Sequence, residues 1–337
     1  MRIVPEFDVP GHTLAMLKAY PEYASGLVEG RDYFSAMGSA LNPARPETFT
    51  FLDRLFGEMA ALFPDRYFHV GGDEISGADW KANAQVQEFM KANGLKTLHE
   101  LESYFFDRVR KGVVTHGKTV VGWEEVARTA IPDDVLVQTW RSSSAVARVT
   151  AQGNRVIATC GFYVDKLWPA EDHYRIDPHD PAACGLTREQ FAEGKAKGRP
   201  EAILAHDQVI DPSLTLSAAQ QALVLGGEAA LWTELVSEEM LDGRLWPGAA
   251  VIAERLWSPA SSATRRRCIG GSSSSTTGYG SRDLWTMPIA GGWSRGWRRA
   301  SQSQWRCCSI SSRRCATMLT TARASLSCRE RSRHPRS

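Results

Sequence analysis

Short apolar segments alternate with longer helical patterns along the first 260 residues of the chain. In the longer segments the apolar positions recur every three to four residues, which predicts helices at 46–63, 83–95, 97–117 and 143–153. The last of these ends at Gly153, as helices often do. The short segments predict buried strands at 2–9, 66–72, 118–123, 134–140 and 155–165, and a sixth within 217–234.

Strands interleaved with helices predict a parallel sheet, either open or closed into a barrel. Polar clusters follow the predicted strands in turn: "PEFDVPGH", "HVGGDE", "GWEE", "QTW", "FYVD" and "GGEAALWTE". Functional residues at the carboxyl ends of many successive strands are typical of a (β/α)8 barrel, whereas an open sheet concentrates them at one switch point. We therefore expect an α/β fold of the TIM-barrel type with about six β/α units, two fewer than a complete barrel.

Residues 261–337 do not continue this pattern. They contain 15 arginines, no lysine and two acidic residues, a net charge of +13, whereas residues 1–260 carry 25 basic and 36 acidic residues, a net charge of −11. Disordered segments are usually poor in aromatic residues, yet four of the eleven tryptophans lie here. We expect a domain at 1–260 followed by a disordered or frame-shifted tail. The alternative is a basic arm that binds nucleic acid, since arginine and tryptophan can contact phosphates and stack on bases.

Several classes of protein find no support in the sequence. Residues 1–260 contain two cysteines, Cys160 and Cys184, which predict neither a disulfide scaffold nor a metal knuckle. There is no apolar run of about 18 residues and no nucleotide-binding glycine motif. Met1 is followed directly by the strand-like 2–9 rather than by a signal peptide. A domain that opens in a core strand leads us to expect that preceding strands are missing.

Two adjacent carboxylates, Asp73 and Glu74, follow the predicted strand 66–72 and its two glycines. Just past a strand end, both side chains can reach one pocket, and glycines allow the backbone to pass close to a ligand. A carboxyl near another carboxylate has a raised pKa, which suits a general acid near neutral pH. The alternative is that both acids merely stabilise a helix N-terminus.

Three tryptophans favour a functional site over a purely structural role. Each lies at the end of a different predicted strand. Glu124 and Glu125 follow Trp123, Glu234 lies near Trp232, and Trp140 is the third. A single tryptophan is by default a core residue. Three at equivalent positions resemble an aromatic box with polar rims, which suits a sugar. Tyr163 and Asp165 add a phenol and an acid at the end of the fifth predicted strand.

These six motifs, in this order, resemble glycoside hydrolase family 20, the β-N-acetylhexosaminidases, from about Arg2 to Pro259. The resemblance implies an exo-acting enzyme that removes terminal N-acetylglucosamine or N-acetylgalactosamine from a glycan or chitooligosaccharide. The implied mechanism is substrate-assisted and retaining, an exception to the two-carboxylate scheme, and it needs no metal or organic cofactor. The spaced acidic pattern of family 18 chitinases is absent.

The resemblance also implies a role for each matching residue. Glu74 would be the general acid and then the base, and Asp73 would orient the substrate's acetamido N–H. Tyr163 would hydrogen-bond the acetamido oxygen. Trp123, Trp140 and Trp232 would surround the acetamido methyl group, and Asp165 and Glu234 would bind sugar hydroxyls. His12 would support the acid. Trp168 matches more loosely and would line the aglycone side.

The chain also departs from the family's pattern. The resemblance implies an arginine and an aspartate on two strands that precede the segment 2–9, and an accessory domain before them, and none of these lies in the chain. The alternative to an active enzyme is therefore a carbohydrate-binding remnant without catalysis. The family suggests an envelope or secreted protein in bacteria, while membrane insertion and nucleic-acid binding are not expected of the domain.

Overall fold

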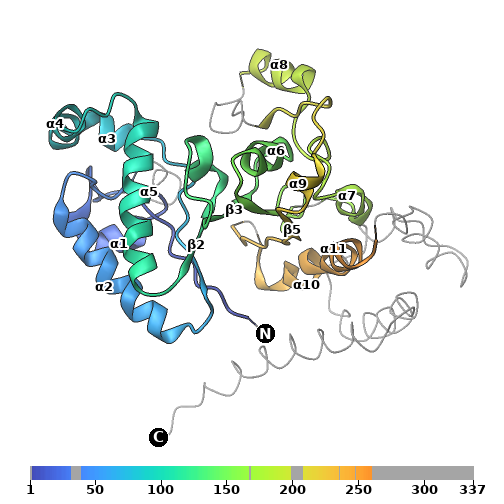
Figure 1. Cartoon of the computed structure of the whole chain (residues 1–337), viewed down its shortest axis with the longest axis horizontal. Coiled ribbons are helices and arrows are strands. Elements are labelled where there is room, and N and C mark those ends of the chain that lie inside the picture. The colour runs from blue at the N-terminus through green and yellow to red at the C-terminus, as the bar shows by residue number, and fades with distance from the viewer. Residues whose placement is uncertain are drawn as a thin grey trace, which may run out of the picture. The chain divides into compact units, whose positions relative to one another are not determined.

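The computed structural model describes residues 2–31, 39–166, 168–198, 208–234, 236–246 and 248–259 (Figure 1). The chain divides into two units, Met1–Trp257 and Ser258–Ser337, and the described helices and strands all lie in the first. The expectations of a shifted reading frame or a nucleic-acid arm in 261–337 lie outside the described residues. Within those described, no helix has the length and apolar character needed to cross a membrane.

A parallel sheet of five strands runs through the first unit in sequence order. The strands are β1 (Tyr67–His69), β2 (Thr119–Trp123), β3 (Leu136–Thr139), β4 (Arg155–Ala158) and β5 (Val224–Gly227). Each pairs with the next in parallel, for example Phe68 opposite Val120. Residues of β1 and β3 are buried throughout, as in a parallel sheet covered on both faces. The order matches successive strands of an α/β barrel.

The predicted first strand, 2–9, is replaced by an isolated parallel bridge between Glu6 and His69. The Phe7 N–H still donates to the His69 carbonyl at 3.0 Å, and the His69 N–H donates to the Pro5 carbonyl at 2.9 Å. Two prolines, Pro5 and Pro10, lack the N–H groups that a longer ladder requires. The sheet thus has five strands where six were predicted, and 2–9 lies beside β1 in the position expected of the first strand.

Helices connect the strands, and the four predicted from periodicity are confirmed. They are α2 (Pro46–Leu62), α4 (Ala84–Ala92), α5 (Leu98–Thr115) and α6 (Ser144–Ala151). The start of α5 is fixed by a capping box, in which Thr97 and Glu100 each accept the other's backbone N–H. The shorter helices are α1 (Leu14–Ala19), α3 (Ala78–Ala82), α7 (Ala170–Arg175), α8 (Arg188–Ala196), α9 (Ala218–Gln221), α10 (Leu241–Leu245) and α11 (Gly248–Trp257), with 3-10 turns η1 (Pro21–Tyr23), η3 (Glu124–Arg128) and η5 (Glu238–Met240).

The main core lies between the sheet and the pair α2 and α5, which run beside each other next to β1 and β2 (Figure 1). Phe56 of α2 packs on Phe68 of β1 with ring centroids 5.2 Å apart, and Phe49 packs on Phe105 of α5 at the same distance. Burial of such rings is the largest favourable contribution to folding. These helices hold β1 in place, and the two adjacent carboxylates follow β1 in the chain.

A disulfide joins Cys160 to Cys184, which the sequence analysis did not predict. It connects the segment after β4 to the irregular region before α8, across 24 residues. Two cysteines separated by irregular sequence give no signal of their own, because their pairing depends on the path of the chain between them. The bond constrains the loop that carries Tyr163 and Asp165.

Reduction of this disulfide is expected to lower the free energy of unfolding by about 3 kcal/mol, because the unfolded chain regains the entropy of an open loop. Thermal unfolding with and without reductant measures the change. The double variant Cys160→Ser/Cys184→Ser is the control, since its Tm is expected to be low and insensitive to reductant. A Tm equal to that of the oxidised wild type in this variant would contradict the expectation.

Candidate active site

Asp73 and Glu74 follow β1 after two glycines that both have positive φ, Gly71 at 70° and Gly72 at 101°. A Cβ on Gly71 would lie 1.7 Å from Oδ1 of Asp8, so only glycine permits this close approach. The Gly72 N–H donates to Asp8 Oδ1 at 2.9 Å. The glycine pair therefore joins the end of β1 to the segment 2–9 and turns the two carboxylates towards it.

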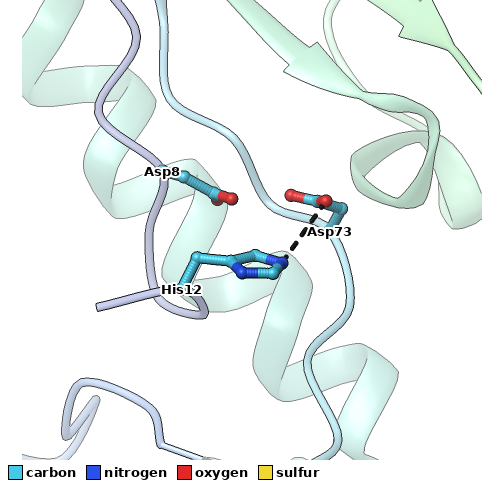
Figure 2. Close-up of side chains that lie close together, drawn as sticks. All are labelled: Asp8, His12 and Asp73. Carbon is cyan, nitrogen blue, oxygen red and sulfur yellow. Dashed lines mark ion pairs between the residues drawn. The ribbon is translucent and has the colours of Figure 1, made fainter. Parts of the chain in front are cut away.

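Asp8 and Asp73 form a hydrogen-bonded carboxyl pair, drawn with His12 in Figure 2. Burial raises the pKa of both groups, and the nearby charge of Asp73 raises the pKa of Asp8 further. The hydrogen bond between the two groups opposes the rise in the pKa of Asp73 and adds to the rise in the pKa of Asp8. Sequence reasoning missed Asp8, although it lies in the quoted "PEFDVPGH", because nothing local distinguishes it from a solvated acid.

His12 lies against both adjacent carboxylates. Its Nε2 is 3.6 Å from Asp73 Oδ2 and 3.4 Å from Glu74 Oε2, so the structure brings together the three residues that the sequence suggested. A hydrogen bond to Glu74 raises the pKa of His12, and the same bond lowers the pKa of Glu74. The expectation of a raised pKa for Glu74 is therefore wrong, because the hydrogen bond to His12 outweighs the effect of burial on this carboxyl. Among the adjacent acids it is Asp73 whose pKa is raised.

The His12–Glu74 pair gives a prediction for stability against pH. The raised pKa of His12 stabilises the folded state. This stabilisation is complete below pH 6.5, the ordinary pKa of histidine, and is lost as pH rises through the pKa of His12 in the folded protein. The lowered pKa of Glu74 stabilises it above about 4.5 and less on further acidification. His12→Gln should therefore lower the free energy of unfolding most between pH 4.5 and 6.5, and less at higher pH.

Urea unfolding at several pH values measures this difference. The matched control repeats His12→Gln in a Glu74→Gln background, where the part that depends on this pair should disappear. A loss from His12→Gln that is the same at every pH would show that the pair does not titrate as described.

Asp8, His12 and Asp73 also form a group that could hold a metal ion, since their ligand atoms lie within 4.8 Å of one another (Figure 2). Asp8 is already engaged, because it is hydrogen-bonded to Asp73 and its Oδ1 accepts from the Gly72 N–H at 2.9 Å. A bound cation would have to displace the hydrogen bond between the two carboxyl groups. The donor set therefore matches a proton-sharing cluster better than a preformed metal site.

Trp123 and Trp232, which end β2 and follow β5, lie next to each other with ring centroids 5.7 Å apart. Trp123 is buried and its indole N–H donates to Glu6 Oε1 at 3.0 Å. Trp232 is 42% exposed, so one ring of the pair remains open to a ligand. These two tryptophans form the part of the predicted aromatic box that the structure assembles directly.

Tyr163 and Asp165 lie beside the Trp232 segment, because Tyr163 forms a parallel bridge with Ala230 and the Val164 N–H donates to the Ala230 carbonyl. Burial raises the pKa of the Tyr163 phenol, which keeps it a neutral donor. Burial also raises the pKa of Asp165, with a contribution from nearby Glu234. Lys166 Nζ lies 4.4 Å from the centre of the Tyr163 ring. Trp168 is 40% exposed, and its ring lies 5.9 Å from both the His173 ring centroid and Lys166 Nζ.

Trp140 has a different environment from the other two tryptophans. Its indole N–H donates to Glu125 Oε2 at 3.2 Å, and the Arg141 guanidinium lies 4.3 Å from its ring centre. Glu124 and Glu125 are 1% and 5% exposed. The interpretation of these glutamates as a polar rim for sugar hydroxyls is therefore wrong, because both carboxylates are engaged inside the protein.

Two buried acceptors of the site, Asp73 Oδ1 and Asp165 Oδ1, have no hydrogen-bond partner within the part of the chain that the structure describes. Unpartnered buried carboxylate oxygens are costly unless a ligand satisfies them. They lie on segments that follow β1 and β4, at the same end of the parallel sheet. This end of the sheet can therefore accept hydrogen bonds from the N–H and O–H groups of a ligand.

Comparison with known proteins gives a consistent result. Glycosyl hydrolase family 20, catalytic domain, matches residues 1–260. The human β-hexosaminidase subunit beta is 31% identical over 267 residues, which cover 77% of this chain and 42% of that protein. The β-hexosaminidase of Porphyromonas gingivalis is 33% identical over 264 residues, 76% of this chain and 31% of the relative. The chain thus spans less than half the length of these curated relatives.

Solved structures show the same fold. The Flavobacterium johnsoniae chitobiase superposes with a TM-score of 0.64 at 36% identity and covers 78% of this chain and 37% of its own. The Vibrio harveyi exo-β-N-acetylglucosaminidase, solved in complex with N-acetylglucosamine, gives 0.57 at 27% identity over 78% of this chain and 39% of its own. The five parallel strands are accordingly part of a TIM-type α/β barrel. The chain belongs to glycosyl hydrolase family 20, with residues 1–260 in its catalytic domain.

Proposed function

We propose that this chain carries the active-site residues of an exo-β-N-acetylhexosaminidase, which removes terminal N-acetylglucosamine or N-acetylgalactosamine from glycans or chitooligosaccharides. The observation that carries the proposal is the adjacent pair Asp73–Glu74, with a buried, unpartnered Asp73 oxygen, at the strand ends that also bear the Trp123–Trp232 pair. This arrangement offers a proton donor and a hydrogen-bond acceptor to neighbouring atoms of one sugar.

In the first step, the carbonyl oxygen of the substrate's own 2-acetamido group attacks the anomeric carbon. The bond from that carbon to the leaving oxygen breaks, and Glu74 donates a proton to the leaving oxygen. The acetamido N–H donates to Asp73, whose charge stabilises the oxazolinium ion that forms. Tyr163, kept neutral by burial, donates its O–H to the acetamido oxygen.

In the second step, Glu74 accepts a proton from water, and the water oxygen attacks the anomeric carbon from the face that the leaving group vacated. The bond from that carbon to the acetamido oxygen breaks, which restores the acetamido group. Two inversions at this carbon give net retention. His12 Nε2 lies 3.4 Å from Glu74 Oε2, and the hydrogen bond between the two side chains lowers the pKa of Glu74. The proposal therefore requires Glu74 to become protonated when a bound glycan expels water and disfavours the ionised carboxylate.

The proposal assigns the remaining residues to binding. Trp123, Trp140 and Trp232 would surround the acetamido methyl group, and Asp165 and Glu234 would accept hydrogen bonds from sugar hydroxyls. The unpartnered Asp165 Oδ1 supports this assignment. Trp168, which is 40% exposed, would contact the aglycone.

The test is hydrolysis of a fluorogenic N-acetyl-β-glucosaminide by the purified 337-residue chain, with the corresponding β-glucoside as the control substrate. We expect the N-acetyl substrate alone to be cleaved, because the glucoside lacks the acetamido nucleophile. Sugar binding without cleavage would favour the alternative of a carbohydrate-binding protein. Equal cleavage of both substrates would contradict the substrate-assisted mechanism.

A further inference from the structure

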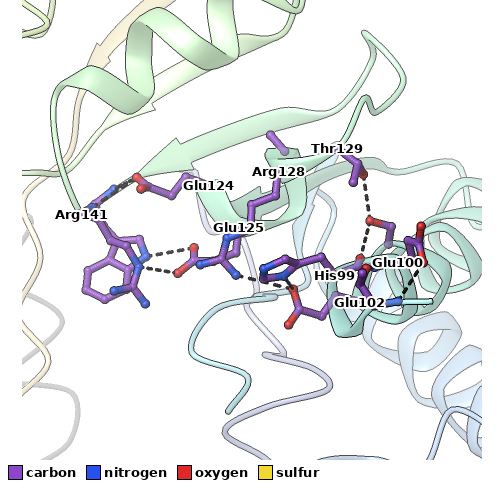
Figure 3. A network of polar contacts seen from close by, with 12 residues as sticks. His99, Glu100, Glu102, Glu124, Glu125, Arg128, Thr129 and Arg141 are labelled. Atoms are coloured by element: carbon purple, nitrogen blue, oxygen red, sulfur yellow. Dashed lines mark hydrogen bonds and ion pairs between the residues drawn. The ribbon is translucent and has the colours of Figure 1, made fainter. Parts of the chain in front are cut away.

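Trp140 is attached to two adjacent buried glutamates through both of its N–H groups. Its backbone N–H donates to Glu124 Oε2 at 2.7 Å, and its indole N–H donates to Glu125 Oε2 at 3.2 Å. Figure 3 shows the two glutamates side by side at the start of η3, facing the residues that follow β3. Hydrogen bonds from these side chains therefore connect the end of β3 to the end of β2, in addition to the backbone hydrogen bonds of the sheet.

Arg141 completes this attachment. Its backbone N–H donates to Glu124 Oε2 at 3.2 Å, and its Nε donates to Glu125 Oε1 at 2.8 Å. The same guanidinium lies 4.3 Å from the centre of the Trp140 ring. The ring is therefore held at its N–H edge by a carboxylate and on its face by the cation that pairs with that carboxylate.

The two glutamates use their oxygens differently. Glu125 accepts with both oxygens, one from Trp140 and one from Arg141. Glu124 accepts both of its hydrogen bonds through Oε2, and its buried Oε1 has no partner in the described ranges. Burial, together with the charge of Glu125, raises the pKa of Glu124 to about 8. Glu124 can therefore carry a proton on Oε1 without losing a contact, whereas Glu125 cannot.

Burying two adjacent carboxylates opposes folding unless hydrogen bonds and counter-charges compensate. Here Trp140 and Arg141 donate the hydrogen bonds that compensate the two carboxylates, and Arg141 also supplies a positive charge. We infer that Glu124 and Glu125 are positioning residues that fix the indole of Trp140 at the end of β3. The consequence for sugar binding rests on the proposed function, in which Trp140 surrounds the acetamido methyl group.

The oxygen usage predicts opposite results for the same substitution at neighbouring positions. Glu124→Gln keeps one carbonyl oxygen for both backbone N–H donors and places its NH2 where Oε1 had no partner. Glu125→Gln replaces one of two oxygens that both accept hydrogen bonds, so either the bond from Trp140 or the bond from Arg141 is lost. We expect Glu125→Gln to weaken binding of N-acetylglucosamine about tenfold, as loss of one charge-assisted hydrogen bond implies, and Glu124→Gln to stay within about twofold of the wild type.

Titration calorimetry with N-acetylglucosamine measures binding, and Trp140→Phe provides a double-mutant cycle because it keeps a ring but removes the indole N–H. In the Trp140→Phe background, Glu125→Gln should add little further loss. Additive losses, or equal losses from the two glutamine variants, would overturn the inference. The control Glu193→Gln on exposed α8 is expected to bind as the wild type does.

A second measurement does not depend on sugar binding or on hydrolysis. The indole 15N–1H resonance of Trp140, assigned by its loss in Trp140→Phe, should move in Glu125→Gln and remain in place in Glu124→Gln. A resonance that is unchanged in Glu125→Gln would overturn the positioning role whatever the activity. A moved resonance in a chain that neither binds nor cleaves the sugar would support the positioning role and count against the proposed function.

Discussion

Glu74→Gln is expected to reduce hydrolysis of an N-acetyl-β-glucosaminide by about 10²- to 10⁴-fold, the usual contribution of general acid–base catalysis. Glutamine is nearly isosteric with glutamate but can neither donate the proton to the leaving oxygen nor accept one from water. Both steps of the proposed reaction therefore fail together. The measurement is kcat/KM of the purified variant beside the wild type.

Binding separates this loss from a folding defect. Because Glu74 acts on the leaving oxygen and on water, N-acetylglucosamine should bind Glu74→Gln with an affinity within a few-fold of the wild type. A substrate whose leaving group needs no proton, such as an activated aryl glycoside, should recover part of the first step. Activity close to the wild type on an unactivated glycan would exclude Glu74 as the acid.

Gly71→Ala is expected to lower the free energy of unfolding by at least about 3 kcal/mol, since it combines a strained backbone with a steric clash. Gly71 has φ +70°, and an added Cβ would lie 1.7 Å from Asp8 Oδ1 and 2.5 Å from Asp8 Cα. The second contact is with the backbone, so rotation of the Asp8 side chain cannot relieve it. The segment 2–9 would have to move away from β1.

Gly94→Ala is the matched control, because Gly94 has nearly the same φ, +68°, and a Cβ there would meet no atom within 4 Å. It should cost only the backbone strain, about 1 kcal/mol. Urea unfolding of the two variants gives the comparison. Equal losses would mean that the close approach of Asp8 to Gly71 contributes nothing, and that the Asp8–Asp73 pair is not held as described.

Much of the fold could be predicted from the sequence because the relevant signals are local. The period of apolar residues in α2, α4, α5 and α6 reflects one buried face, and that face exists whichever partner covers it. The strand 2–9 was the exception. Its apolar residues indicated a strand, but Pro5 and Pro10 limit the ladder, and the pairing shrinks to the bridge at Glu6.

The candidate site was only partly accessible to sequence reasoning. Asp73, Glu74, Trp123 and Trp232 stand out because they follow strands, and parallel strands end at one edge. Asp8 did not stand out, because its importance comes from a hydrogen bond with Asp73, 65 positions along the chain. The Cys160–Cys184 disulfide escaped prediction for the same reason.

By itself the sequence determined the alternation of helices and strands, the parallel sheet, and the set of strand-end residues that bear the chemistry. These properties depend on the order and spacing of residues, which the chain carries before it folds. Tertiary structure alone decided how those residues are charged and what they contact: that His12 lowers the pKa of Glu74, and that Glu124 and Glu125 face Trp140 instead of a ligand. Electrostatic energies and hydrogen bonds depend on distances of a few ångströms between atoms from separate segments, and only the packed fold sets those distances.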